Sequence, residues 1–302
     1  MSTAGLSLVG FMTDQPQAFQ HLRVQCVPAD PSDAALAAAW NAAKAKLGAA
    51  LPNAGAPNIQ AIAAADAPYI NQLVQQPWVQ EAFRLFKYAA ADFKLIEIDP
   101  LLAFQFIVDS PRSNFHCGGL KNPTVADLLP ICLPQTQPKP QDIGPAIDAS
   151  PNHKDIPPQS VTIKVRNLSM QRMHGGIFTL NQNGYESWVV GMQIHVTLPF
   201  VHVVRFNGRC YLHNGFHRSY GARMAGATHI PCLFRDVATP EEVGIIEGQT
   251  FSVPILESAN PPTIGHFTQG RAYDVELRAL SRVMHVSWSQ SVMVDEYERM
   301  NP

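Results

Sequence analysis

The residues best suited to chemistry with a charged ligand are Asn214 to Arg218, which read Asn-Gly-Phe-His-Arg. Gly215 has no Cβ, so a ligand can approach its backbone closely. A helix is predicted to begin after it, and the unpaired N–H groups of a helical first turn favour an anion, most often phosphate. His217 and Arg218 fall in that turn, where the helix dipole disfavours positive charge by about 0.3–1 kcal/mol per group. This misfit indicates an anion-binding site.

A second interpretation of the same residues needs no ligand. Arg218 would then pair with a carboxylate such as Asp236, and His217 would be an ordinary packed or exposed histidine. The spacing alone is compatible with both interpretations.

A compact succession of elements is predicted to position this segment. β-Branched and aromatic residues form two strands, and the Asn207-Gly208 dipeptide between them tolerates the two positive φ angles of a type I′ turn. Gly226 supplies the residue that a helix end prefers at positive φ. In chain order we expect a strand at 200–206, a strand at 209–213, a helix at 216–225 and a strand at 230–234.

This succession resembles the ParB/sulfiredoxin fold over Phe200 to Val237, and more distantly at Ile96 to Asp109, where Gln105 matches the family's glutamine. Sulfiredoxins carry Gly-Cys-His-Arg at the helix start, ParB proteins carry Gly-Glu-Arg-Arg, and some free-serine kinases of this fold carry Gly-x-x-Arg. The resemblance implies that Gly215, His217 and Arg218 hold the phosphates of a nucleotide, with Asn214, Phe216 and Gln105 beside them.

The chain also departs from the family's pattern. Phe216 stands where sulfiredoxins have their reactive cysteine and ParB proteins their catalytic glutamate. Neither sulfinic-acid repair nor ParB-type CTP hydrolysis can therefore be carried over. Asn214 precedes the glycine where kinase-like members commonly have an acidic residue. The phosphate-binding residues are present, and the family's reactive group is missing.

The expected fold class is α+β. We expect a ParB/sulfiredoxin-like mixed-sheet core over residues 95–240, with a proline-rich insertion near 133–160. A helical N-terminal region should occupy 1–94, and a C-terminal helix and strands should occupy 241–302 and pack on the core. Local patterns further predict a strand at 22–27, helices at 34–47, 59–73 and from Pro77, a strand at 161–165, a tight turn at Gly175-Gly176 and a strand pair within 273–294.

The amino-acid composition disfavours some classes of binding partner. Charged residues make up 15% of the 302 residues and the formal net charge is −2, so the chain lacks the basic balance of a sequence-independent DNA binder. Five scattered cysteines without a C-x-x-C pair are typical of reduced thiols in a cytoplasmic protein. No window approaches the ~18 uncharged apolar residues of a membrane span. We expect a cytoplasmic protein with no membrane partner. The sequence leaves open whether the protein forms a homo-oligomer.

Two functions from different classes remain. In the first, the chain binds an NTP, either ATP or CTP, with or without Mg²⁺. His217 and Asp236 then catalyse phosphoryl transfer to water or a small acceptor. Asp109 and Glu241 are alternatives to Asp236 as the acid. In the second, the chain is a non-catalytic module that senses a nucleotide or small phosphorylated ligand. A nuclease is disfavoured because no carboxylate cluster is visible, and His116, Cys117 and Cys132 lack metal-ligand spacing, so no metal site is predicted.

Common catalytic motifs are absent from the sequence. It contains no G-x-x-x-x-G-K-[ST] loop, no G-x-G-x-x-G, no H-E-x-x-H and no G-x-S-x-G. NTPases, dehydrogenases, zinc proteases and hydrolases that depend on these motifs are therefore not indicated.

Overall fold

The computed structural model describes residues 2–25, 31–85, 91–136, 145–148, 160–165, 170–182, 185–196, 199–245, 250–278 and 282–287. Its contacts divide the chain into two units. Unit 1 comprises Met1–Gln137 and Leu198–Ala279, and unit 2 comprises Pro138–Thr197 and Leu280–Pro302. The division predicted at residues 94/95 and 240/241 stays a prediction. Most of the proline-rich stretch, 137–144 and 149–159, lies outside the described residues.

A five-stranded mixed sheet forms the centre of unit 1. Its order is β10-β9-β11-β3-β2, and its strands are β2 (Ile59–Ala61), β3 (Asp92–Glu97), β9 (His202–Phe206), β10 (Arg209–Asn214) and β11 (His229–Asp236). β9 and β11 are parallel, and the other neighbouring pairs are antiparallel. A parallel pair needs a crossover connection, which here contains α8 (Phe216–Met224).

The hairpin of β9 and β10, which leads into α8, has the turn that the sequence predicts. Asn207 and Gly208 have φ angles of 48° and 74°, as a type I′ turn requires. β10 pairs with β9 from Arg209 to Asn214, which brings Asn214 opposite His202. Gly226 ends α8 with a φ of 106°. The strand, turn, strand, helix and strand expected from the sequence are therefore confirmed.

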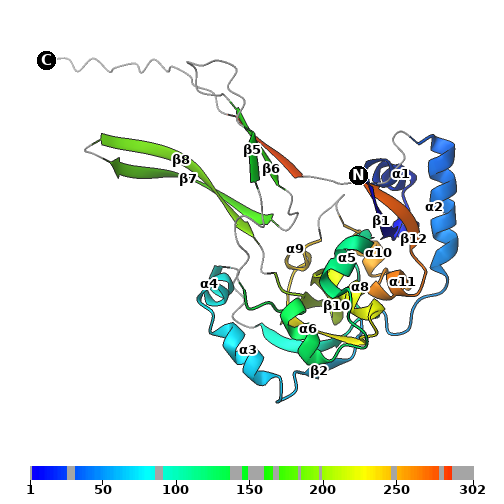
Figure 1. Ribbon diagram of the computed structural model, residues 1–302. Coiled ribbons are helices and arrows are strands. Elements are labelled where there is room, and N and C mark those ends of the chain that lie inside the picture. Colours follow the sequence, from blue (N-terminus) through cyan, green and yellow to red (C-terminus); the bar gives the residue numbers. More distant parts are fainter. Residues whose placement is uncertain are drawn as a thin grey trace. The chain divides into compact units, whose positions relative to one another are not determined.

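A second sheet of unit 1 joins the two ends of that unit. β1 (Ser2–Ser7) lies between β12 (Tyr273–Arg278) and β4 (Ile107–Asp109), and both pairings are antiparallel. The N-terminal region therefore contains strands as well as helices. Figure 1 shows α1 (Gln15–Gln25) and α2 (Asp33–Leu47) near this sheet.

The helices begin and end with clear capping signals. Ser32 accepts a hydrogen bond from Ala35 N at the start of α2, and Gly48 ends that helix at φ 63°. Thr124 and Asp127 form a capping box, and so do Thr239 and Glu242. The remaining helices of unit 1 are α3 (Ala67–Val74), α4 (Pro77–Leu85), α5 (Ser110–Cys117), α6 (Val125–Cys132), α9 (Pro240–Val243), α10 (Val253–Leu256) and α11 (Ile264–Thr268), with a 3-10 turn, η1, at Val9–Phe11.

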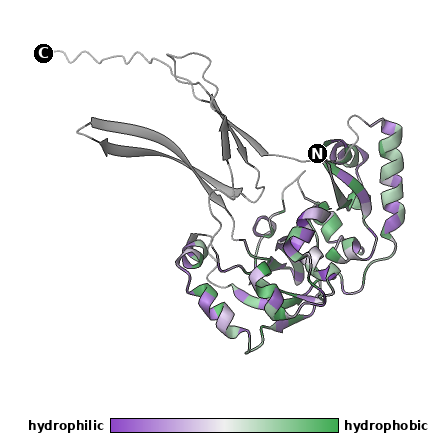
Figure 2. Cartoon of the chain, viewed as in Figure 1, coloured by the Kyte–Doolittle hydropathy of each residue, from purple (hydrophilic) through white to green (hydrophobic). Residues whose placement is uncertain are grey.

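The core of unit 1 is one continuous cluster of buried apolar side chains. It includes Ile96 on β3, Val203 on β9 and Leu233 on β11, each fully buried. Figure 2 shows hydrophobic and hydrophilic residues interleaved along the helices of unit 1, as expected when one helix face packs on a core. The chain is thus an α+β protein, and the mixed sheet of unit 1 carries the predicted anion site.

Unit 2 consists of strands in the described residues. β5 (Pro145–Asp148), β6 (Ser160–Val165) and β13 (Arg282–Ser287) form one antiparallel sheet, in the order β13-β6-β5. β7 (Met170–Gln182) and β8 (Tyr185–Val196) form a long hairpin. The expected strand at 161–165 is confirmed as part of β6.

Four local expectations are wrong. Gly175 and Gly176 form no turn, because they continue β7 opposite Met192 and Gly191. Residues 22–25 are helical rather than extended, and residue 27 lies outside the described residues. Ile59–Ala61 is a strand ahead of α3, so the helix expected over 59–73 is only partly present. The strands expected within 273–294 are present as β12 and β13, but they do not pair with each other, since β12 pairs with β1 and β13 with β6.

Candidate functional site

The start of α8 has a backbone geometry that only glycine fits. Gly215 has a φ of 103° and occupies the N-cap position without a side-chain hydrogen bond. A Cβ at this position would lie 2.8 Å from Val201 Cγ2 and 3.1 Å from Val201 Cα. The first turn of α8 contains no acidic residue. Its N–H groups therefore have neither a capping side chain nor a neighbouring carboxylate on the same turn.

Phe216, the first residue of α8, is a packing residue. It is 2% exposed, and its ring meets that of Phe104 edge to face with centroids 5.6 Å apart. The position at which, by the resemblance considered from the sequence, sulfiredoxins and ParB proteins carry a reactive group is thus filled by an apolar side chain in the core. Its burial fixes the first turn of α8 against the segment before β4.

Arg218 is anchored to backbone carbonyls. Its Nη1 donates to Ile131 O at 3.3 Å, to Cys132 O at 3.4 Å and to Pro199 O. The first two carbonyls end α6, where a positive charge is favourable for the helix dipole. The hydrogen bonds that this guanidinium makes within the described chain all leave from Nη1. Pairing of Arg218 with Asp236, the alternative considered from the sequence, is wrong.

Close packing of α5 on α8 brings further basic residues to this turn. Gly221 lies so near α5 that a Cβ would be 2.9 Å from Ser113 O and 3.0 Å from Cys117 Cβ. Cys117 Sγ donates a long hydrogen bond of 3.6 Å to Arg218 O. Figure 1 shows the two helices side by side. We use the name basic cluster for four of the five basic side chains of this helix pair: Arg112 and His116 on α5, with His217 and Arg218 on α8.

Burial and neighbouring cations lower the pKa of the histidines in the basic cluster. Burial first, and then the charges of Arg112, His116 and Arg218, lower the pKa of His217 to about 3. Burial first, and then Arg218 and Arg112, lower the pKa of His116 to about 4. Burial also lowers the pKa of Arg218 below its ordinary value. Because both pKa values lie well below 7, each histidine is neutral at pH 7. A bound anion would raise these pKa values.

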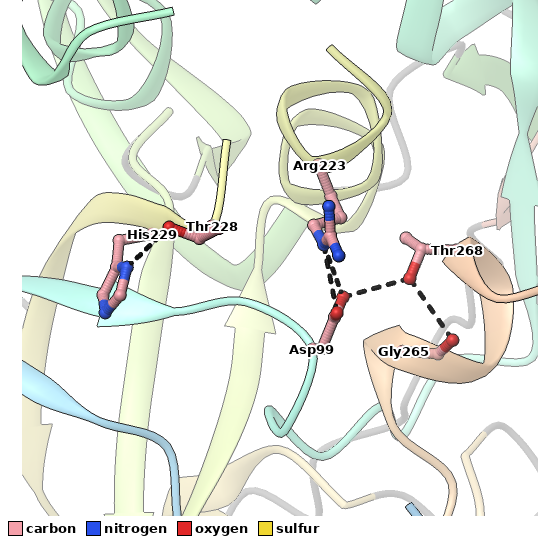
Figure 3. A network of polar contacts seen from close by, with 6 residues as sticks. All are labelled: Asp99, Arg223, Thr228, His229, Gly265 and Thr268. Carbon is pink, nitrogen blue, oxygen red and sulfur yellow. Dashed lines mark hydrogen bonds and ion pairs between the residues drawn. The ribbon is translucent and has the colours of Figure 1, made fainter. Parts of the chain in front are cut away.

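The other end of α8 is held by a polar network, shown in Figure 3. Arg223 Nε lies 3.0 Å from both carboxylate oxygens of Asp99, which also accepts a hydrogen bond of 3.0 Å from Thr268 Oγ1. Thr268 belongs to α11, and its hydroxyl also reaches Gly265 O. Arg218 and Arg223 therefore fix the two ends of α8, which gives the basic cluster a rigid support.

Asp236, predicted as a catalytic acid, lies elsewhere on the central sheet. Its carboxylate pairs with Arg205 through contacts of 2.6 Å to Nε and 3.0 Å to Nη2. Along β9, Asp236 is opposite Arg205 whereas Asn214 is opposite His202. Three residues of a parallel strand span about 10 Å. The start of α8 and Asp236 are therefore at opposite ends of β9, and the structure does not bring Asp236 to His217.

Asp236 instead lines a hollow of about 350 Å³ on unit 1. The hollow combines charged side chains from three neighbouring strands with the ring of Phe234. Its lining consists of Ile59, Asp92, Lys94, Arg205, Phe234, Arg235 and Asp236. We call it the paired-charge hollow, because its cations meet carboxylates.

The remaining predicted residues are dispersed. Asn214 lies at the end of β10, where its Nδ2 donates to Phe200 O at 3.0 Å. Gln105 is exposed and follows Phe104, the ring neighbour of Phe216. Asp109 caps α5 by accepting from Arg112 N at 3.3 Å, so it lies just before the helix that carries Arg112 and His116. Glu241 is in the first turn of α9.

Sequence reasoning missed Arg112 and His116 as ligand-binding candidates. They are four residues apart on one helix, and this spacing places two side chains on one face. Asp109 as N-cap and Pro111 in the first turn were the local signals for that helix. The packing of α5 against α8 is not encoded in any local pattern.

The comparisons add no relative to these observations. No family model, curated protein or solved structure matches the chain. Among the described residues, no group of three or more His, Cys, Asp or Glu side chains is arranged to hold a metal ion. In that same part of the chain, the helices are too short or too polar to cross a membrane.

Proposed function

We propose that this protein binds the phosphate groups of a nucleotide at the basic cluster, on a fold of the ParB/sulfiredoxin type. The observation that carries the proposal is the cluster itself: the packing of α5 on α8 brings its basic side chains near the start of α8, and basic side chains lower the pKa of its histidines in addition to burial. A bound anion would be stabilised by the two arginines and would raise the pKa of the two histidines. The hairpin, α8 and the parallel return strand β11 support the fold proposal.

Each part of the site has a distinct role in this proposal. The backbone N–H groups of the first turn of α8 bind phosphate oxygens, because no side chain caps them. Arg112, which is exposed, supplies a mobile guanidinium for bidentate contact. His116 and His217 donate hydrogen bonds and take up protons as the anion raises their pKa. Arg218 holds the turn in place through its carbonyl contacts and adds positive charge.

Binding without turnover is the form of the proposal that the geometry favours. Asp236 is paired with Arg205 at the far end of β9, so the acid and His217 do not form one catalytic pair. Phosphoryl transfer is the second candidate, and it depends on Asp109, the acid that caps α5. Such a reaction would require Asp109 to leave its capping position and act on water or a small acceptor.

The first test is a calorimetric and thermal-shift titration with ATP, CTP and inorganic triphosphate, each with and without Mg²⁺. Ligands that bind the native state raise its apparent stability. We expect binding to the wild type, and we expect Arg112→Gln to weaken it by about 10- to 100-fold, the loss of one charge-assisted hydrogen bond. Arg84→Gln is the matched control, because Arg84 is an exposed arginine on α4 that pairs with Glu81.

The outcomes separate the alternatives. Equal affinity in Arg112→Gln and Arg84→Gln would place the ligand away from the basic cluster and overturn the site. Absence of binding by any of these ligands would overturn the function. Release of phosphate from a bound NTP, lost in Asp109→Asn, would select the catalytic candidate over the sensing module.

A further inference from the structure

Phe115 on α5 is the most exposed large apolar side chain among the described residues. It is 85% exposed, compared with 58% for Met224 and 49% for Val24. Burial of a phenyl ring stabilises a folded protein by about 1.5–3 kcal/mol, and this residue gains almost none of it. An aromatic ring that is held in solvent on a rigid helix can serve as a contact surface for a flat apolar group.

The position of Phe115 connects it to the basic cluster. Its ring meets the ring of His116 edge to face, with centroids 5.4 Å apart and an interplanar angle of 75°. Arg112 is three residues earlier on the same helix, which places the two Cβ atoms about 5–6 Å apart. A flat apolar surface and a group of cations therefore lie next to each other on α5.

We propose that Phe115 stacks on the base of a nucleoside di- or triphosphate whose phosphates bind the basic cluster. This inference rests on the proposed function and names the ligand class: the two adjacent surfaces match the two chemically different parts of a nucleotide. Orthophosphate or a small phosphorylated acid would leave the ring uncovered. Because every base has a π-face, stacking contributes affinity with little discrimination among bases.

The experiment compares ATP, CTP and inorganic triphosphate on the full chain by calorimetry. We expect Phe115→Ala to weaken ATP and CTP binding by about 5- to 100-fold, since stacking on an aromatic residue contributes about 1–3 kcal/mol per base. Affinity for inorganic triphosphate should not change. Phe115→Trp should restore nucleotide affinity, and Phe115→Leu should not, because leucine offers an apolar surface without a ring.

Met224→Ala is the matched control, as Met224 is another exposed large apolar residue of unit 1, on α8. If Phe115→Ala and the wild type bind ATP equally while both bind inorganic triphosphate, the stacking role is overturned and the proposed function stands. If the wild type binds neither ligand, the proposed function fails and this inference fails with it. A change in oligomeric state in Phe115→Ala, with nucleotide affinity unchanged, would assign the ring to contacts between protein chains instead.

Discussion

The basic cluster and the paired-charge hollow both gather cations on unit 1, but among the described residues only the cations of the hollow form ion pairs with carboxylates. In the hollow, Lys94 pairs with Asp92 at 2.6 Å and Arg205 pairs with Asp236. Arg235, the third cation there, lies 3.8 Å from Glu242. In the cluster, the groups that act on each histidine have the same sign of charge.

This difference bears on where an anion would bind. The hollow has a volume of about 350 Å³, yet an incoming anion would have to displace carboxylates that already satisfy its cations. In the cluster, Arg218 is held by backbone carbonyls rather than by a carboxylate. A ligand that supplies negative charge therefore gains more at the cluster, and the following changes test that contrast.

The largest effect is expected for Gly215→Ala, which should disrupt the cluster and leave the hollow intact. The new Cβ would meet Val201 at 2.8 Å while the backbone keeps a φ of 103°. Overpacking costs about 1–3 kcal/mol and the left-handed conformation a further ~1–2 kcal/mol. We expect the free energy of unfolding, measured with urea, to fall by about 2–5 kcal/mol.

Gly208→Ala is the control for the conformational part of that loss. Gly208 also has a positive φ, of 74°, but a Cβ added there would meet nothing within 4 Å. Its free energy of unfolding should therefore fall by only ~1–2 kcal/mol. Equal losses in the two variants would contradict the close approach of Val201 to the start of α8.

The second effect concerns acid stability. His217 has a pKa of about 3 in the folded chain and 6.5 as its ordinary value, so the unfolded chain binds more protons between these values. Its contribution to stability is complete above pH 6.5 and is lost as the pH falls towards 3. We expect the wild type to lose about 2 kcal/mol more than His217→Gln between pH 7 and pH 4.5.

The hollow should behave differently in this range of pH. The hydrogen bond from Lys94 is the main cause that lowers the pKa of Asp92, so its contribution is present above 3.8 and is lost only below that value. Denaturation of Asp92→Asn at pH 7 and pH 4.5 should therefore give the same difference from the wild type. Two results would contradict the contrast between the two regions. One is a stability difference between Asp92→Asn and the wild type that changes with pH, and the other is a stability difference between His217→Gln and the wild type that does not.

The smallest effect is expected for Asp236→Asn. Asp236 and Arg205 are exposed, and exposed ion pairs contribute about 0–1 kcal/mol. We expect the free energy of unfolding to fall by less than about 1 kcal/mol, with unchanged affinity for ATP in a calorimetric titration. Loss of nucleotide affinity in this variant would instead return Asp236 to the site that the sequence suggested.

The part of this fold that follows from the sequence is the part that local chemistry determines. Asn207-Gly208 sets the turn, Gly215 and Gly226 bound α8, and Thr239 caps α9 because each side chain acts on residues near it in the chain. The α+β class follows from these elements. The same information identified His217 and Arg218 as neighbours of a helix start.

The remainder depends on contacts between distant segments. Gly221 lets α5 approach α8, and this contact, between residues about a hundred positions apart, completes the basic cluster with Arg112 and His116. The role of Arg218 also required the structure, since its partners are carbonyls, which carry no residue-type signal. Gly175 and Gly176 suggested a turn because glycine permits one, but pairing with β8 extended the strand instead.

The pairing of β1 with β12 has a consequence for the newly made chain. One edge of β1 can pair with β4 early, whereas its other edge has no partner until Tyr273–Arg278 has been synthesised. β6 likewise has one edge without a partner strand until Arg282–Ser287 has been synthesised. Open strand edges invite pairing with other chains. Nascent chains that stop before residue 273 should therefore depend on chaperones to avoid aggregation.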